Sequence, residues 1–307
     1  MPSPPDTVFF LSDYGTRDEF AGVVRAVLRR LAPHAAVIDL THEVPPFDVA
    51  AGARALVRSM PYLGDGVVLA VVDPGVGSAR RGIALHVDGA ERQWFFVGPD
   101  NGLLLPGAEL GGVTVDAVEL GGPVPEPGAA TFDGRDVFAP AAAALCNGAS
   151  LRDIGTAIDS ESLVRLLLPL SKRATLSDGR AVRWCQVGWV DHFGNLQLSA
   201  SPNDEDPEVF ALAWAEDDTH APRGFSDRMV RRVRAFAELR PGELGLIVDA
   251  NGRFALVVRE GSASDQLGIG TGHVVGLAEP PARAHPPEHT DPNTPTRLGP
   301  VDPPVRS

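Results

Sequence analysis

The sequence predicts an α/β protein with two domains: an N-terminal α/β domain with a largely parallel sheet, then a smaller, mainly β domain. Two observations predict this class. The first half of the chain alternates short apolar runs with helical patterns. After about Lys172 the apolar runs are short, and turns rather than strong helices separate them. A chain of 307 residues is long enough for two such domains.

The N-terminal half opens with alternating strands and helices. This order favours parallel pairing, because a crossover helix returns the chain to the same edge of the sheet. In chain order these elements are the strand Thr7–Ser12, the helix Phe20–Leu31, the strand Ala36–Leu40, the helix Val49–Met60 and the strand Val67–Val72. Further strands are predicted at Ile83–Val87, Trp94–Val97 and Val113–Val118, followed by an alanine-rich helix at Asp136–Cys146.

The C-terminal half has four clear β runs and one candidate helix, around Arg228–Leu239. The runs are Val182–Val190, Glu243–Val248, Phe254–Val258 and His273–Leu277. We place the α/β domain at residues 1–172 and the β domain at 173–279. Proline and polar residues dominate from Pro280 onward, which predicts a disordered, Pro-rich tail over 280–307.

Charge and composition exclude several classes of partner. The formal net charge of −13 argues against nucleic acid, whose phosphates are met by a surplus of basic residues. No apolar run approaches the roughly 20 residues that span a bilayer, and no signal peptide is evident. Cys146 and Cys185 lie far apart and are expected to be free thiols in a reducing compartment. We therefore expect a soluble, cytoplasmic protein.

The stretch VVDPGVGSAR, residues 71–80, is the first candidate site. A plain turn accounts for its proline and glycines. It does not account for Asp73 at the end of a buried strand, because an ionised carboxylate there needs a partner. Arg80 is the obvious partner. An Asp–Arg pair at the carboxyl edge of a sheet is a functional candidate, and a structural ion pair remains the alternative.

Other carboxylates follow neighbouring strands. Asp13, in SDYG, is suited to a ribose diol or to capping the next helix, and alone it favours the cap. Asp39 and His42 are conceivable metal ligands together with Asp13 and Asp73. No compact cluster with metal-ligand spacing supports this, so a His–Asp contact that holds a loop is favoured. GPDNG (98–102) and TFDGRD (131–136) are turn signals, and Asp136 is a candidate helix cap.

In the second domain, VDHFGNL (190–196) combines a carboxylate, an aromatic ring and an amide. Phe193 is suited to stacking on a nucleobase and Asn195 to pairing with an adenine edge. An ordinary hairpin turn at Gly194-Asn195 is the alternative. The chain has no nucleophile elbow, no P-loop and no dinucleotide-binding glycine fingerprint.

Taken in order, these motifs resemble the S-adenosyl-L-methionine (SAM) hydroxide adenosyltransferase family, also called SAM hydrolases and related to the fluorinases and chlorinases. The matching stretches, within residues 7–277, are SDYG, DLTHEVPPFD, VVDPGVGSAR, GPDNG, TFDGRD, VDHFGN and GSASDQLGIGTG. The resemblance implies a C-terminal β-barrel and a homotrimer with SAM bound between subunits. It also implies attack of water or hydroxide on C5′ of SAM, giving adenosine and L-methionine without a cofactor or metal.

The resemblance assigns the chemistry to Asp73 and Arg80. Asp73 would orient the water and accept its proton, and Arg80 would hold that carboxylate. The halogenases carry tyrosine at the position of Asp73, so the aspartate favours water over halide. Asp133 is a departure, because the hydrolases carry histidine there in an Asp–Arg–His set. Two carboxylates, Asp73 and Asp133, would then share Arg80.

The resemblance also assigns the substrate contacts. Asn251 is a candidate replacement for a family hydroxyl that Ala250 lacks. The other expected contacts are Asp13 with the ribose hydroxyls, Asp191 with the methionine ammonium, Phe193 with the adenine face, Asn195 with the adenine edge and Phe47 as a further wall. Because Asp133 and Ala250 depart from the family, a SAM- or adenosine-binding protein without turnover remains the main alternative. A SAM-dependent chlorinase is a more remote one.

Overall fold

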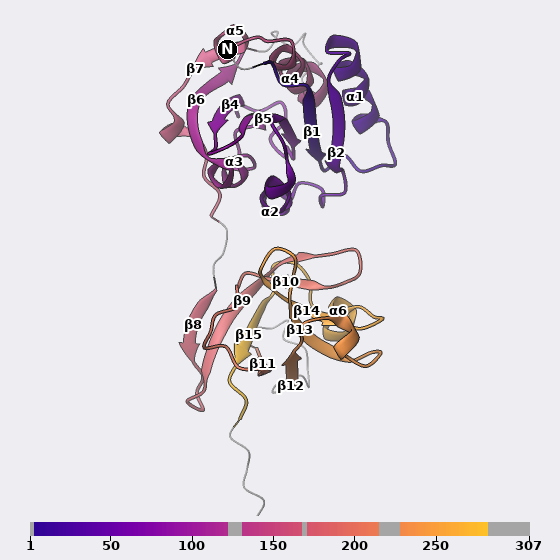
Figure 1. Ribbon diagram of the computed structural model, residues 1–307, viewed down its shortest axis with the longest axis vertical. Helices are drawn as coiled ribbons and strands as arrows, with labels where there is room; N and C mark the ends of the chain where they lie inside the picture. Colours follow the sequence, from indigo (N-terminus) through magenta and orange to yellow (C-terminus); the bar gives the residue numbers. More distant parts are fainter. Residues whose placement is uncertain (1–2, 122–130, 168–170, 215–227, 282–307) are drawn as a thin grey trace, which may run out of the picture.

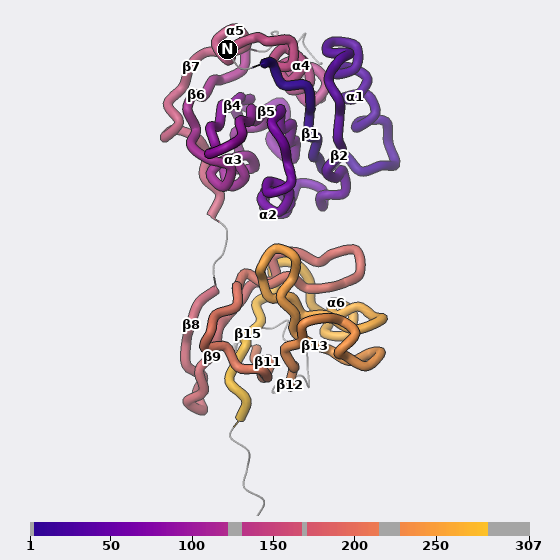
Figure 2. The backbone as a smooth tube through the Cα atoms, in the orientation of Figure 1, coloured from indigo at the N-terminus to yellow at the C-terminus, as the bar shows by residue number. Residues whose placement is uncertain are grey.

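The computed structural model describes residues 3–121, 131–167, 171–214 and 228–281. They form an α/β domain and a β-barrel domain that follow one another along the long axis of the molecule (Figure 1). The trace in Figure 2 shows that the two halves of the sequence form separate bodies and do not intermix. The predicted two-domain fold class is confirmed. Nearly all of the predicted tail lies outside the described residues.

The N-terminal domain is built on a seven-stranded sheet in the order β2-β1-β3-β5-β4-β6-β7. Strands β2, β1, β3 and β5 are parallel, whereas β4, β6 and β7 join antiparallel. Their bounds are β1 Thr7–Ser12, β2 Ala36–Thr41, β3 Gly66–Val71, β4 Gly82–Asp88, β5 Gln93–Pro99, β6 Val113–Leu120 and β7 Gly155–Ala157. The parallel part therefore places the ends of β1 and β3 side by side.

Helices cover both faces of this sheet. The helical segments are α1 Phe20–Leu31, α2 Val49–Ser59, α3 Leu105–Gly111, α4 Ala139–Cys146 and α5 Leu151–Ile154, with a π-helical turn at Gly134–Phe138. Helices α2 and α3 pack on one face, and α1 and α4 on the other. Strand β3 shows why its sequence is continuously apolar: Val68 and Ala70 enter one core, and Val67 and Leu69 the other.

The C-terminal domain is a closed barrel of seven strands in the order β9-β10-β14-β13-β12-β11-β15, and β15 pairs again with β9. Strand β8 pairs with β9 outside the ring. The bounds are β8 Lys172–Thr175, β9 Ala181–Val190, β10 Leu196–Leu198, β11 Val209–Ala213, β12 Arg228–Arg232, β13 Leu244–Val248, β14 Phe254–Val258 and β15 Val274–Ala278, with the short helix α6 at Ala263–Leu267. The expected barrel is thus present.

Two local predictions were wrong. The segment predicted as a helix, Arg228–Leu239, begins as strand β12 and ends in a single 3₁₀ turn, Phe236–Glu238. Pairing with β11 and β13 holds the first part of this segment as a strand, and Val230 enters the barrel core. Asp136 does not cap α4, because the chain enters this helix through the π-helical turn, and the Asp136 carboxylate binds Arg135. No helix in the described ranges is long and apolar enough to cross a membrane.

Candidate active site

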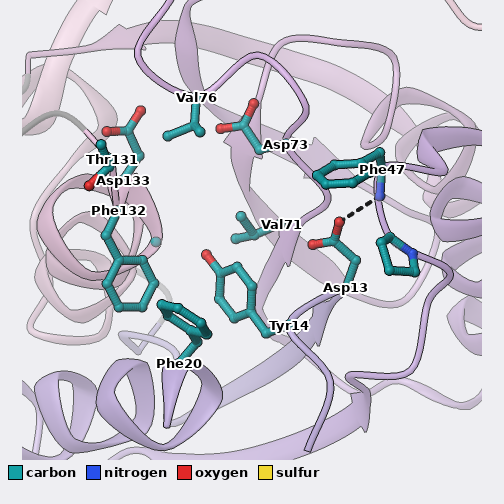
Figure 3. Close-up of a pocket in the computed structure, with 12 residues that line it drawn as sticks. Asp13, Tyr14, Phe20, Phe47, Val71, Asp73, Val76, Thr131, Phe132 and Asp133 are labelled. Atoms are coloured by element: carbon teal, nitrogen blue, oxygen red, sulfur yellow. Dashed lines mark hydrogen bonds between the residues drawn. The ribbon is translucent and has the colours of Figure 1, made fainter. Parts of the chain in front are cut away.

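A cavity of about 260 Å³ opens at the carboxyl edge of the parallel strands (Figure 3). Ligands of open α/β sheets bind at this edge, because the loops that leave neighbouring strands meet there. The loops after β1 and β3, the turn before α2 and the start of the π-helical turn supply its walls. The lining residues are Asp13, Tyr14, Phe20, Pro46, Phe47, Val71, Asp73, Val76, Thr131, Phe132, Asp133 and Gly134.

Two carboxylates share one arginine at this wall. Arg80 Nε donates to Asp73 Oδ1 over 2.9 Å, and Arg80 Nη2 donates to Asp73 Oδ2 and to Asp133 Oδ2. The Asp73 and Asp133 side chains are only 7% and 19% exposed, so both charges are largely withdrawn from water. The predicted Asp73–Arg80 pair is present, and Asp133 joins it from 53 residues further along the chain.

The turn after β3 brings Arg80 back over Asp73. The Val76 amide donates to the Asp73 carbonyl, and the Ser78 amide to the Gly75 carbonyl, so the chain folds tightly. Gly77 has a φ of +76°, which glycine adopts without strain. The predicted turn and the Asp73–Arg80 pair are therefore one feature, because the fold of the turn brings the two side chains together.

The charge of Arg80 is secured by its surroundings. Burial alone would lower the pKa of Arg80, but hydrogen bonds and charge attraction from Asp73 and Asp133 outweigh burial and raise it. The guanidinium also lies 5.2 Å from the centroid of the Phe138 ring. Arg80 thus stays cationic and fixes both carboxylates in one orientation.

Arg81, the next residue, binds structural partners away from the cavity. Its Nε donates to Asp100 Oδ2 over 2.9 Å, and its Nη2 donates to the carbonyl of Ser162 over 2.8 Å. The other Asp100 oxygen accepts from the Val164 amide. In the same GPDNG loop, Asn101 Nδ2 donates to the carbonyl of Val72. This loop therefore supports the strand end beneath the site and does not line the cavity.

Asp13 anchors the opposite wall. Its Oδ2 accepts a hydrogen bond from the Phe47 amide over 2.9 Å, while the Phe47 ring is 72% exposed and its φ is +69°. A positive φ is costly for phenylalanine and often marks a functional position. Burial raises the pKa of Asp13 and the negative charge of Asp73 adds to this, against the lowering by the Phe47 amide. Asp13 does not cap α1, whose N-cap residue is Glu19.

The metal-site alternative finds no geometric support. Asp39 is paired with Arg25, and His42 Nε2 lies 3.1 Å from Asp39 Oδ1. His42 Nδ1 shares a hydrogen bond with the Ser12 hydroxyl, so the predicted His–Asp contact holds the loop beside β1. Within the described ranges, no three His, Cys, Asp or Glu side chains are grouped to hold a metal ion.

None of the predicted C-terminal residues lines this cavity. Asp191 Oδ1 accepts hydrogen bonds from the Phe193 and Asn195 amides, and its Oδ2 accepts one from Asn195 Nδ2. Asp191 thereby shapes the β9–β10 hairpin, with Gly194 at a φ of +80° and the Phe193 ring 73% exposed. The Asn251 amide donates to Asp249 in the β13–β14 turn.

The cavity also has an aromatic wall that was not predicted from the sequence. Tyr14, Phe20 and Phe132 pack ring against ring, with centroids 5.2 to 6.0 Å apart. Tyr14 and Phe132 stand inside the motifs SDYG and TFDGRD, directly beside Asp13 and Asp133, and that adjacency was the available signal. These rings give the cavity an apolar wall, which suits a nucleoside.

Comparisons with known proteins agree with this arrangement. Residues 8–155 match the model of the SAM hydroxide adenosyltransferase N-terminal domain, and residues 185–276 match that of the C-terminal domain. The chain is 44% identical over 277 residues to an (R)-S-adenosyl-L-methionine hydrolase of Salinispora tropica, covering 88% of this chain and 97% of that protein. It is 38% identical over 284 residues to a protein of the same name from Thermus thermophilus, covering 88% and 98%.

Fluorinases are more distant: one from an Actinoplanes species is 30% identical over 212 residues, covering 62% of this chain and 70% of that protein. A crystal structure of an uncharacterized conserved protein from Thermotoga maritima superposes with a TM-score of 0.73 at 29% identity, covering 88% of this chain and 99% of that one. The two family models thus cover both domains, including the barrel and the segments that form the cavity. The chain belongs to the SAM hydroxide adenosyltransferase family.

Proposed function

We propose that this protein hydrolyses SAM to adenosine and L-methionine. The observation that carries the proposal is the arginine shared by Asp73 and Asp133 at the wall of the cavity. Relatives at 38–45% identity are named (R)-S-adenosyl-L-methionine hydrolases, which supports the same reaction here.

The difficult requirement of this reaction is an effective nucleophile. The water oxygen forms a bond to C5′ while the C5′–S bond breaks. The electron pair of the C5′–S bond stays on sulfur, so the sulfonium becomes a neutral thioether. No acid is needed for departure. Water is a weak nucleophile, so a fixed carboxylate that orients it and takes its proton lowers the barrier. Asp73 fills this role, and Arg80 keeps the carboxylate in place.

The same charges disfavour halide. Two carboxylates in a partly buried wall repel an approaching chloride or fluoride ion, and Arg80 is already occupied by both. Asp133 replaces the histidine expected from the family resemblance, and it brings a second acceptor to the wall. The site is therefore suited to a donor such as water rather than to an anion.

For substrate binding we propose that Asp13 takes the ribose hydroxyls and that a neighbouring subunit completes the pocket. Phe47 and Phe193 are among the most exposed aromatic side chains in the described residues, and a homotrimer would bring one against the other. Asp191, Asn195 and Asn251 would then act at the amino-acid and adenine ends of SAM. The buried thiols Cys146 and Cys185 suit a reducing compartment such as the cytoplasm.

The decisive test is turnover. Purified protein is incubated with SAM, with and without chloride, and the nucleosides are separated by liquid chromatography. We expect adenosine in proportion to enzyme and independent of chloride. Asp73→Asn keeps the shape, removes the base, and should reduce kcat by about 100-fold or more. Asp39→Asn is the matched control, because Asp39 also pairs with an arginine but lies outside the cavity.

Two results would contradict the proposal. Intact SAM after long incubation, with adenosine bound in calorimetry, would favour the non-catalytic binding protein. Near-normal turnover by Asp73→Asn would refute the role of this carboxylate. Asp133→His then tests the departure from the family: higher turnover would mean that Asp133 limits hydrolysis, and lower turnover that Asp133 has its own role.

The shared-site proposal has a separate test. Asp73→Asn and Phe193→Ala each damage a different domain, so a mixed oligomer contains some pockets in which both residues are intact. At a low SAM concentration, where both variants turn over slowly, mixing them under conditions that allow subunit exchange should restore part of the activity. No restoration, or a monomer in sedimentation analysis, would contradict a site built between subunits.

A further inference from the structure

Tyr14 brings a phenol hydroxyl to the cavity that the chemistry above does not use. Its ring is fixed by contacts with Phe20 and Phe132, whose centroids lie 6.0 and 5.6 Å away. Gly134 packs against the hydroxyl so closely that a Cβ at this position would overlap Tyr14 Oη. Among the residues that the structure describes, no protein group exchanges a hydrogen bond with Tyr14 Oη. The hydroxyl is therefore held in place and left available to a ligand.

The surroundings make this hydroxyl a donor. Burial raises the pKa of Tyr14, and the negative charges of Asp13, Asp73 and Asp133 raise it further, against the opposing effect of Arg80. The phenol thus keeps its proton at any physiological pH. Figure 3 shows the hydroxyl directed toward the side of the cavity where Asp133 lies, and away from Phe47. It is a neutral donor close to the carboxylates of the reacting wall.

We propose that Tyr14 Oη donates a hydrogen bond to the water that attacks C5′, an inference that rests on the proposed hydrolysis. A water molecule has two protons and two lone pairs. Asp73 and Asp133 can accept the two protons, and Tyr14 can bind one lone pair. The remaining lone pair is then the one that faces C5′. Fixing three of the four tetrahedral directions selects the attack orientation and contributes to rate through positioning.

This role predicts a specific kinetic signature for Tyr14→Phe, which keeps the ring and removes only the hydroxyl. Because the hydroxyl binds the water and not SAM, kcat should fall by about 10- to 100-fold while KM and the adenosine affinity stay unchanged. Tyr62→Phe is the matched control: Tyr62 is the other of the two tyrosines in the chain and is 74% exposed.

A second variant tests the geometry. Gly134→Ala should displace the hydroxyl and reduce kcat in the wild-type background. The ring carbon Cζ of Tyr14 lies 3.1 Å from the added Cβ, so without the hydroxyl the methyl group meets only a tight contact. In the Tyr14→Phe background Gly134→Ala should therefore cost much less, and a double-mutant cycle measures that coupling.

The outcomes separate the two proposals. If wild-type protein makes no adenosine, the proposed hydrolysis fails and this inference fails with it. If wild-type protein is active and Tyr14→Phe matches it, only the role of Tyr14 is refuted. A higher KM with unchanged kcat would refute it too, because the hydroxyl would then bind SAM itself.

Discussion

Replacing Arg80 with methionine tests whether the shared guanidinium offsets the burial of two carboxylates. Methionine keeps most of the length of the side chain but removes the guanidinium, its charge and its contact with the Phe138 ring. Removing one partner of a buried ion pair costs about 3–5 kcal/mol, because the remaining charge is left uncompensated. Asp133 is 19% exposed and can be hydrated in part, so we expect the lower end, about 3 kcal/mol.

The assay follows the free energy of unfolding of the N-terminal domain in urea. The far-ultraviolet helix signal reports this domain, because all described helices of seven residues or more lie in it. Arg25→Met is the matched control. It breaks the Arg25–Asp39 pair, whose side chains are 45% and 34% exposed, so the expected loss is only about 0–1 kcal/mol.

A rescue distinguishes charge from packing. Adding Asp73→Asn and Asp133→Asn to Arg80→Met removes both uncompensated charges, and more than half of the lost stability should return. A loss in Arg80→Met no larger than that in Arg25→Met would refute the reasoning. So would a triple variant that is no more stable than Arg80→Met alone.

Two further predictions concern the opposite wall and the barrel. The raised pKa of Asp13 means that ionising this carboxyl costs folding stability. The free energy of unfolding of wild type relative to Asp13→Asn should therefore fall as pH rises from 3.8 through the raised pKa, and then level off. Urea titrations across this pH range measure the difference, and an increase of wild-type stability relative to Asp13→Asn with pH would contradict the prediction. Phe193→Ala should weaken adenosine binding about 5- to 150-fold, the usual contribution of base stacking, with unchanged unfolding, since the ring is 73% exposed. Calorimetry measures this, with the exposed barrel residue Phe236→Ala as control; equal affinities in the two variants would exclude stacking on Phe193.

Local patterns predicted the N-terminal core well. Strand β1 and helix α1 have the predicted bounds. The patterns that predict them, an apolar run and helical spacing of apolar residues, are formed by residues close together in the sequence. The Asp73–Arg80 pair was predicted for a similar reason, since a seven-residue separation within one turn leaves few alternatives. The sharing of Arg80 with Asp133 depended on the family resemblance, because 53 residues separate the two.

The remaining features depend on pairings distant in sequence. Helix α3 contains a proline and two glycines and was not predicted, because packing against α2 rather than propensity holds it. The segment that contains strand β12 was predicted as a helix, but pairing with β11 and β13 makes β12 part of the barrel. The role of Asp191 within its own hairpin was missed, since a loop carboxylate in the sequence does not reveal which amides it binds.

Arg80 and Arg81 are adjacent in the chain, yet Arg80 binds the carboxylates that line the cavity, and Arg81 ties the strand ends to the segment that leads toward the barrel. The length of the turn between Asp73 and this pair is therefore a strict constraint. Deletion of a single residue would bring Arg81 to the position of Arg80 and Gly82 to that of Arg81. Insertion of one residue would bring Ala79 to the position of Arg80. In either case one set of carboxylates would lose its guanidinium. Substitutions at the turn's exposed positions would be tolerated more readily than any change in its length, so natural or designed relatives should vary here in composition and not in spacing.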